Sequence, residues 1–283
     1  MNRILIALAA ASLASSVPLA AHADEGMWPL DLFPTDAINK AHGTHVDQKL
    51  IDKAMHASVR FNNGGSGSVV SKDGLVMTNH HVAEDCIQKL GTVPGAPNYM
   101  MDGFVSKSEA DEGKCPDLEL NILQTIKDVT ADVESAAKDA KSDADKNSAR
   151  KAAMAKIEKA CADETKMRCD VVTLYGGGVY NLYTYKKFTD VRLVFAPEFQ
   201  SAFFGGDPDN FTYPREDLDA AFFRVYENDK PVAVKDWFTF STRGPQDGET
   251  VFVSGHPGST DRFTVLAKLE LQRDVQYPFI LEG

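Results

Sequence analysis

The stretch from Gly65 to Val82 places the tightest constraint on what this chain of 283 residues can fold into. It reads GSGSVVSKDGLVMTNHHV, which is typical of two short strands joined by a tight Asp-Gly turn. The second strand would end at Thr78, just before the histidine pair His80 and His81. Short strands separated by glycine turns are typical of β-barrel proteins. We therefore expect a fold that is mainly β.

Residues 125–166 interrupt this pattern with a long run of Ala, Lys, Asp and Glu, which predicts one or two polar helices. Strand-like stretches then return at 171–175, 180–185, 191–195, 220–226 and 250–253. From residue 261 the pattern becomes helical again. We therefore expect a β region over 24–260 with a helical insertion at about 125–166, and the start of a further helical region over 261–283.

Residues 1–23 predict a secretory signal peptide. Asn2 and Arg3 precede an apolar run over 4–11, and residues 21–23 have the small-x-small pattern of a cleavage site. The apolar run is too short to cross a membrane as a helix. We therefore expect a secreted or periplasmic protein with no membrane span.

Charge and glycine spacing argue against several function classes. The formal net charge of −11 disfavours a generally basic nucleic-acid-binding chain. The run 176–178 of three glycines reads as a turn between strands and does not match a phosphate-binding loop. The cysteines lack the paired spacing of a zinc site. The sequence therefore predicts no nucleic-acid partner, no organic cofactor and no metal.

The cysteines indicate disulfides instead. Cys86, Cys115, Cys161 and Cys169 form an even set in a chain that we expect to enter an oxidising compartment. Four cysteines allow three pairings. The short polar stretch between Cys161 and Cys169 favours that pair, which would leave Cys86 with Cys115.

The histidine pair and one aspartate point to acid–base chemistry. Histidine changes charge near neutral pH, so an imidazole held at a strand end can take up and return a proton. A carboxylate that orients such an imidazole is expected at the head of an apolar strand. Asp219 directly precedes the apolar stretch 220–223 and matches that position, with Asp217 as a nearby competitor.

Longer motifs carry a family resemblance. The pattern of Gly65–Val82 resembles the chymotrypsin-like serine peptidases and the HtrA/Deg-type proteases, and both place the catalytic histidine at His81. The segment Phe204–Arg215 reads FGGDPDNFTYPR. It closely resembles a signature of the bacterial dipeptidyl-peptidases of the 7 and 11 types. Motifs at 26–28 and 255–258 resemble the same family, so the resemblance covers most of the mature chain.

This resemblance implies a fold, a reaction and a set of site residues. It implies a chymotrypsin-like fold whose first β-barrel is complete or nearly so and whose second barrel is missing. His81 would be the general base and Asp219 the acid that orients it. Asn210 would bind the free α-amino group of a peptide substrate, with Phe211 beside it. The family also implies release of dipeptides from free N-termini and a homodimer of the full-length protein.

The chain departs from the family pattern at several places. Val82 stands where the family commonly has Cys, and Phe211 stands where it commonly has Trp. No Gly-Asn-Ser-Gly turn, which would carry the nucleophilic serine, follows Asp219. Ser241 and Ser259 come later but lie in no such turn. We therefore expect an N-terminal portion of a serine dipeptidyl-peptidase, which is inactive on its own.

Two other functions stay open. An HtrA-like serine endopeptidase would share the histidine motif, but it gives no reason for the signature at 204–215. A non-catalytic exported peptide-binding protein would keep the amine site without a nucleophile. Loss of activity on N-acetylated substrates would favour a dipeptidyl-peptidase over the endopeptidase. The coding sequence beyond residue 283 would test the hypothesis of a binding protein, which predicts no serine turn there.

Overall fold

The computed structural model describes residues 27–203, 217–256 and 264–282. These residues divide into two compact units. Of the described residues, 27–53 and 239–253 belong to the first unit, and 54–203, 217–238, 254–256 and 264–282 belong to the second. The predicted signal peptide and the predicted amine-binding residues Asn210 and Phe211 lie outside the described residues.

The first unit is helical in its N-terminal part. It contains η1 (Leu30–Leu32), α2 (Thr35–His42) and most of α3 (Gln48–Ala57). The turn between α2 and α3 is closed by Asn39, whose side chain accepts a hydrogen bond from the backbone N–H of Val46 and donates one to its carbonyl, both at 2.8 Å.

The second unit is built on one antiparallel sheet. Its strands are β1 (Ser58–Phe61), β2 (Ser66–Val69), β3 (Leu75–Thr78), β4 (Phe104–Val105), β5 (Gly113–Lys114), β6 (Leu120–Asp128), β7 (Arg168–Leu174), β8 (Val179–Phe188), β9 (Asp190–Ala196), β10 (Ala221–Glu227) and β11 (Lys230–Pro231). Their order is β4-β9-β10-β3-β2-β1-β6-β8-β7, with β11 on β10 and β5 on β9. The expectation of a mainly β fold with helices is confirmed.

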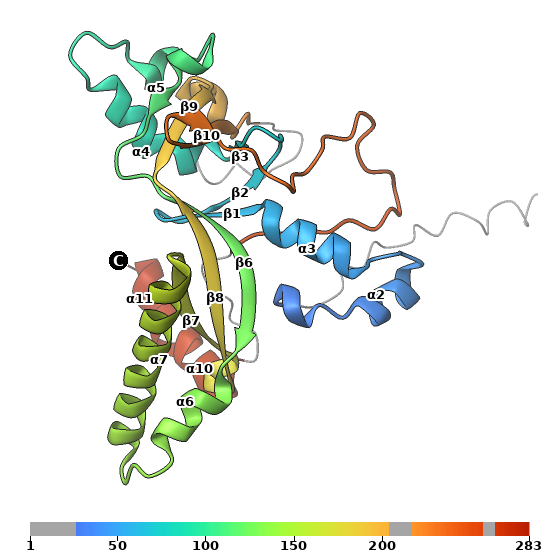
Figure 1. Cartoon of the computed structure of the whole chain (residues 1–283), viewed down its shortest axis with the longest axis vertical. Coiled ribbons are helices and arrows are strands. Elements are labelled where there is room, and N and C mark those ends of the chain that lie inside the picture. The colour runs from blue at the N-terminus through green and yellow to red at the C-terminus, as the bar shows by residue number, and fades with distance from the viewer. Residues whose placement is uncertain (1–26, 204–216, 257–263, 283) are drawn as a thin grey trace, which may run out of the picture. The chain divides into compact units, whose positions relative to one another are not determined.

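The expected barrel is not closed in the described part of the chain. The sheet begins at β4 and ends at β7, and these two strands do not pair with each other. The long strand β8 has β6 along one edge and β7 along the other, which makes β7 the last strand at this end of the sheet. The result is an open antiparallel sheet, in which β6 and β8 form the longest pair (Figure 1).

The second unit also contains helices. They are α4 (His80–Gly91), α5 (Tyr99–Asp102), η2 (Glu109–Asp111), α6 (Thr130–Ala137), α7 (Asp143–Thr165), η3 (Tyr175–Gly177), α8 (Phe199–Ala202), α10 (Leu266–Leu271), η4 (Gln272–Gln276) and α11 (Tyr277–Glu282). Figure 1 shows α6 and α7 at one end of the β6–β8 pair and α4 and α5 toward the other. None of the helices in the described ranges is both long and apolar enough to cross a membrane.

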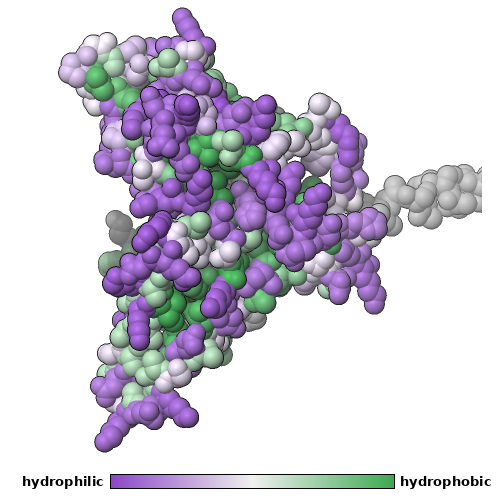
Figure 2. Space-filling model, in the orientation of Figure 1, coloured by the Kyte–Doolittle hydropathy of each residue, from purple (hydrophilic) through white to green (hydrophobic). Residues whose placement is uncertain are grey.

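The main core lies between α4 and the sheet. One face of α4 is buried because its apolar residues recur at helical spacing. This face contributes Val82, Ala83, Cys86 and Ile87, and they share one cluster with Val59, Phe61, Val76, Leu193 and Phe223 of the strands. Hydrophilic side chains cover most of the face seen in Figure 2, including the tip of the α6–α7 hairpin, with apolar areas between them.

A second, smaller core holds α6 and α7 on β7 and β8. Its buried residues are Val129, Val133, Cys169, Val171, Tyr180 and Leu182. The side chain of Ser142 caps α7 by accepting the backbone N–H of Asp145 at 3.1 Å. A disulfide between Cys161 and Cys169 ties the end of α7 to β7. Residues 125–128, which the sequence assigned to the helical insertion, continue β6 instead.

The stretch 250–253, expected as a strand, forms none in the structure. Its Thr-Val-Phe-Val sequence has high strand propensity. Val253 is nevertheless 98 % exposed, and no described strand pairs with this stretch. A stretch with strand propensity forms a strand only where another edge offers backbone partners, and no described strand offers them to this stretch.

Candidate active site

The strand β3 brings polar residues to one point at its end. Its last residue, Thr78, is fixed by a 2.8 Å hydrogen bond from its hydroxyl to the carbonyl of Ser66 on β2. Asn79 follows in an extended conformation (φ −79°, ψ 153°), and α4 begins at His80. The histidine pair therefore lies in the first turn of a helix, whereas the sequence placed it at a strand end.

The two histidines face different surroundings because consecutive helical residues point about 100° apart. His80 is 1 % exposed and belongs to the interior. The side chain of His81 is 67 % exposed. Of the two, His81 is therefore the one whose ring a solvent molecule or substrate can reach.

His81 contacts Asp219 through its ring. Nδ1 of His81 lies 2.7 Å from Oδ2 of Asp219. An ionised carboxylate only accepts hydrogen bonds, so Nδ1 carries the proton in this contact and Nε2 is the acceptor of the neutral ring. Nε2 has no hydrogen-bond partner among the described residues. This geometry suits a general base that is open to solvent.

Asp219 is held by further donors from the start of α4. The backbone N–H of His81 donates to Oδ1 at 3.1 Å. The side chain of Asn79 donates to Oδ2 and to the backbone carbonyl of Asp219, both at 3.2 Å. The first N–H groups of a helix have no partner within the helix, and a negative charge is favoured there. Asp219 thus caps α4, while the preceding Asn79 makes no side-chain cap of its own.

The pairing of β3 with β10 places the aspartate. Ala221, the first residue of β10, lies opposite Thr78, the last residue of β3. Asp219 precedes this pair and His81 follows it, so the two side chains meet beyond the same end of the sheet. The competitor Asp217 makes no contact with His81, and both of its carboxyl oxygens are buried without a partner in the described ranges. The structure therefore brings together His81 and Asp219.

A buried charged cluster that the sequence analysis missed fixes the other end of β10. The side chain of Glu112 is 2 % exposed. Its Oε1 accepts a 2.9 Å hydrogen bond from Nε of Arg224, and its Oε2 accepts a 2.7 Å hydrogen bond from the hydroxyl of Tyr226. Burial, with the Glu112 contact, raises the pKa of Tyr226 well above its ordinary value. The only sign of this cluster in the sequence was Arg224, a charged residue inside the otherwise apolar stretch 221–226.

A disulfide joins the same region to α4. Cys86 of α4 is bonded to Cys115, with their Cα atoms 5.2 Å apart. Cys115 lies three residues after Glu112, which binds Arg224 of β10. The disulfide and the Glu112 contact therefore connect α4 to β10 at a second place, away from His81 and Asp219. Both disulfide pairings are those that the cysteine spacing favoured.

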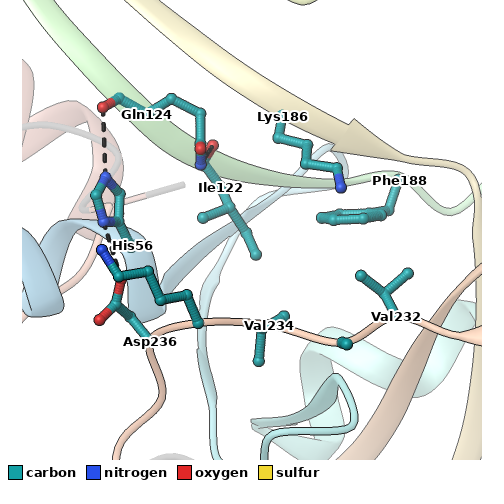
Figure 3. Close-up of a pocket in the computed structure, with 10 residues that line it drawn as sticks. His56, Ile122, Gln124, Lys186, Phe188, Val232, Val234 and Asp236 are labelled. Atoms are coloured by element: carbon teal, nitrogen blue, oxygen red, sulfur yellow. Dashed lines mark hydrogen bonds and ion pairs between the residues drawn. The ribbon is translucent and has the colours of Figure 1, made fainter.

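A pocket of about 250 Å³ lies elsewhere in the second unit. Its lining includes Ile122, Phe188 and Val232, but neither His81 nor Asp219. At its margin the ring of His56 lies between Oδ2 of Asp236, at 3.2 Å, and the carbonyl of Gln124, at 3.4 Å (Figure 3). The pocket is therefore separate from the candidate catalytic pair.

Neither a metal site nor a nucleophile accompanies the pair in the described part of the chain. No group of three or more His, Cys, Asp or Glu side chains there is arranged to hold a metal ion. No described serine hydrogen-bonds to His81. The hydroxyl of Ser66 instead accepts the backbone N–H of His256 at 2.7 Å. Within the described ranges the site is thus a histidine ring oriented by a carboxylate.

Comparisons with known proteins identify relatives of this chain. The Asp/Glu-specific dipeptidyl-peptidase of Porphyromonas gingivalis is 32% identical in sequence to this chain, over 95% of this chain and 40% of its own length. Dipeptidyl-peptidase 7 of Porphyromonas endodontalis is 32% identical over 93% of this chain and 34% of its own length. The chain thus spans less than half of these relatives.

Solved structures show the same likeness. The crystal structure of Porphyromonas endodontalis DPP11 in complex with the dipeptide Arg-Glu matches with a TM-score of 0.67 and 32% identity, over 80% of this chain and 35% of that chain. The family described as Peptidase S46 matches residues 23–282. This match covers nearly the whole chain and includes both His81 and Asp219, so the chain belongs to the peptidase S46 family.

Proposed function

We propose that this chain is the base-bearing portion of an exported serine dipeptidyl-peptidase, which releases dipeptides from the free N-termini of peptides. The observation that carries the proposal is the 2.7 Å contact between Nδ1 of His81 and Oδ2 of Asp219 in a member of the S46 family. An oriented imidazole with a free Nε2 is what acyl transfer from a peptide to a serine hydroxyl requires.

In the proposed reaction a serine hydroxyl attacks the carbonyl carbon of the second peptide bond of the substrate. Nε2 of His81 takes the hydroxyl proton and then returns it to the leaving amine as the peptide bond breaks. Water next attacks the acyl-enzyme, with His81 again as base, and the dipeptide leaves. Asp219 keeps the proton on Nδ1 and stabilises the imidazolium that forms in each half of the cycle.

The nucleophilic serine would come from sequence outside residues 1–283. The chain spans only 40% and 34% of two curated relatives, which leaves ample length for a second part of the enzyme. A base without a nucleophile and an oxyanion site cannot form an acyl-enzyme. Residues 1–283 alone should therefore hydrolyse no peptide.

The substrate and its compartment follow from sequence motifs. Asn210 and Phe211 would bind the free α-amino group, since an amide oxygen and an aromatic face both suit an ammonium ion. Export is supported by the leader pattern over 1–23 and by the two disulfides, because disulfides persist in oxidising compartments. A homodimer of the full-length protein belongs to the same proposal.

The first test is to sequence the coding DNA beyond codon 283 and to express the whole reading frame. We expect a frame that continues to a Gly-Asn-Ser-Gly turn, and an enzyme that removes dipeptides from peptides with a free amine but not from N-acetylated ones. A stop codon directly after Gly283 would instead favour a non-catalytic peptide-binding protein. Equal cleavage of free and acetylated peptides would favour an endopeptidase.

A further inference from the structure

Asn79 stands where a helix cap is expected, yet its side chain makes no cap. It directly precedes α4 in an extended conformation. Asparagine is among the residues preferred there, because its side-chain oxygen can accept an N–H of the first turn. The side chain of Asn79 accepts no such hydrogen bond, and the N–H of His81 goes to Oδ1 of Asp219 instead. Helix capping therefore does not explain this side chain.

The amide of Asn79 is directed at Asp219. Its Nδ2 lies 3.2 Å from Oδ2 of Asp219 and 3.2 Å from the backbone carbonyl oxygen of the same residue. A primary amide carries two N–H groups, so one can serve each acceptor. Oδ2 is also the oxygen that contacts Nδ1 of His81, at 2.7 Å. One side chain thus holds both the backbone of Asp219 and the oxygen that orients the imidazole.

The carboxylate of Asp219 depends on such contacts to keep one orientation. The last torsion of an aspartate side chain has only broad minima, so hydrogen bonds decide where the two oxygens point. The side chain of Asp219 is also 32 % exposed, and water can compete for Oδ2. Asn79 follows Thr78, which pairs with Ala221 of β10. The sheet therefore fixes a donor beside this oxygen, which a passing water molecule cannot do.

We propose that Asn79 is a positioning residue for the His81–Asp219 pair, whose amide holds Oδ2 of Asp219 against Nδ1 of His81. The proposal rests on the proposed function, because it explains how the acid that orients the base is itself oriented. This role uses Asn79 as a hydrogen-bond donor, whereas a helix cap uses it as an acceptor. The two roles therefore predict opposite results when the amide is replaced by a carboxylate.

Two variants separate these roles. Asn79→Ala removes the donor and adds no charge. Asn79→Asp keeps the shape of the side chain and is as good a helix cap as asparagine, but its carboxylate cannot donate and repels Asp219. A capping role predicts that the Asp variant resembles the original chain and that the Ala variant is worse. A positioning role predicts that the Asp variant is the more impaired of the two.

The readout is the tautomer of His81 in residues 1–283, obtained from the ¹⁵N chemical shifts of its ring at pH 8. At this pH an exposed carboxyl group is ionised and an ordinary imidazole is neutral. We expect the ratio of Nδ1–H to Nε2–H tautomer to fall about threefold in Asn79→Ala and about tenfold in Asn79→Asp. The variant His81→Gln assigns the signals.

Asn63→Asp is the matched control. Asn63 is exposed, and its Nδ2 donates to the carbonyl of Val82 in α4 at 3.1 Å. This variant makes the same change from amide to carboxylate against the same helix, but at a hydrogen bond that goes to the helix backbone rather than to Asp219. It should leave the tautomer ratio of His81 unchanged. A fall as large as that in Asn79→Asp would overturn the proposal, because added charge near α4 would then explain the effect.

The ranking of the two Asn79 variants decides between the roles. A ratio in Asn79→Asp that is unchanged, or closer to the original than that of Asn79→Ala, would overturn the proposal. Circular dichroism checks the fold, which an exposed substitution should leave intact. If Asn79→Asp alone unfolds, the Ala variant decides, and an unchanged ratio there overturns the proposal. Unfolding of both variants would show a general structural role and would also overturn it.

This readout is independent of peptide hydrolysis. A full-length enzyme that proved inactive would refute the proposed function but would leave the tautomer result intact. Conversely, an unaltered tautomer ratio would refute the role of Asn79 and leave the peptidase proposal standing.

Discussion

Asp219 accepts two hydrogen bonds from one residue: the backbone N–H of His81 reaches Oδ1 at 3.1 Å, and the ring Nδ1 lies 2.7 Å from Oδ2. The same carboxylate therefore caps a helix and orients an imidazole. Movement of α4 relative to β10 would break both contacts together. Two contacts between the same residues fix both the position and the orientation of the ring, as the proposed general base requires.

Asp219→Asn should disable the base while preserving most of the fold. An amide can donate to Nδ1, which favours the Nε2–H tautomer that cannot take a proton from serine. In the enzyme made from the whole reading frame, kcat should fall by roughly 10⁴-fold, the loss known for this change in a serine triad. The control is Asp217→Asn, since Asp217 has no contact with His81. Equal losses in both variants would contradict the assignment of Asp219.

The two disulfides should differ in their effect on stability. Cys86 and Cys115 are separated by 29 residues, whereas Cys161 and Cys169 are separated by 8. Loop-closure entropy then predicts that the longer crosslink contributes about 3.6 kcal/mol and the shorter about 2.5 kcal/mol to the free energy of unfolding. Urea unfolding of the two double Cys→Ala variants compares them. A larger loss from the 161–169 pair would show that loop length does not control the effect.

Neutralising Glu112 should be costly although it lies away from the candidate site. Glu112→Gln leaves the guanidinium of Arg224 without its buried counter-charge, which typically costs about 3–5 kcal/mol. Tyr226→Phe removes only one hydrogen bond to Glu112 and should cost about 1–2 kcal/mol. Glu109→Gln, at an exposed position nearby, is the control. Chemical denaturation of these variants measures the ranking, and a change for Glu112→Gln no larger than the control would contradict it.

Acid should destabilise the fold through His256. Burial, with a smaller effect of Arg60, lowers the pKa of His256 to about 4. The unfolded imidazole titrates at about 6.5, so between these values the unfolded state binds a proton that the folded state does not. The contribution to stability is full above pH 6.5 and is lost as the pH falls toward 4, by about 2 kcal/mol between pH 7.5 and pH 5.

Urea midpoints of the original chain and of His256→Gln at these two pH values provide the measurement. The substituted chain should lose less stability on acidification, by about 2 kcal/mol. A residual slope remains in the variant, because the pKa of His80 is also lowered by burial. Identical pH dependence in both proteins would show that His256 takes up protons equally in the folded and unfolded states.

Local patterns in the sequence were enough to predict the strand that leads to the histidine pair. The Asp-Gly turn before β3 is one reason, because Gly74 has φ 68° and a Cβ there would lie 2.9 Å from the carbonyl of Val232. The contact of Asp219 with His81 was predictable too. Once a candidate base is known, an aspartate at the start of an apolar strand is a strong candidate for the carboxylate that orients it. The signature at 204–215 then indicated the family, although that segment lies outside the described residues.

Features that depend on distant partners were not predictable from local patterns. Glu112 and Tyr226 are 114 residues apart in the chain, and the residues beside each of them in the sequence do not predict the contact. The sheet is open because its terminal strands β4 and β7 do not pair, and no single strand pattern encodes which strands become the ends of a sheet. The stretch 250–253 has strand propensity without a partner edge, so propensity alone was misleading there.

The register of β3 against β10 also sets an order of events as the chain is made. His81 and Asp219 are 138 residues apart, so a ribosome releases the histidine long before the carboxylate exists. Closing so long a loop comes late in folding, because the entropy must be given up before the contacts form. While the earlier strands are being made, the imidazole has no Asp219 carboxylate to hold its ring. It gains its orientation only when β10 adds to the sheet.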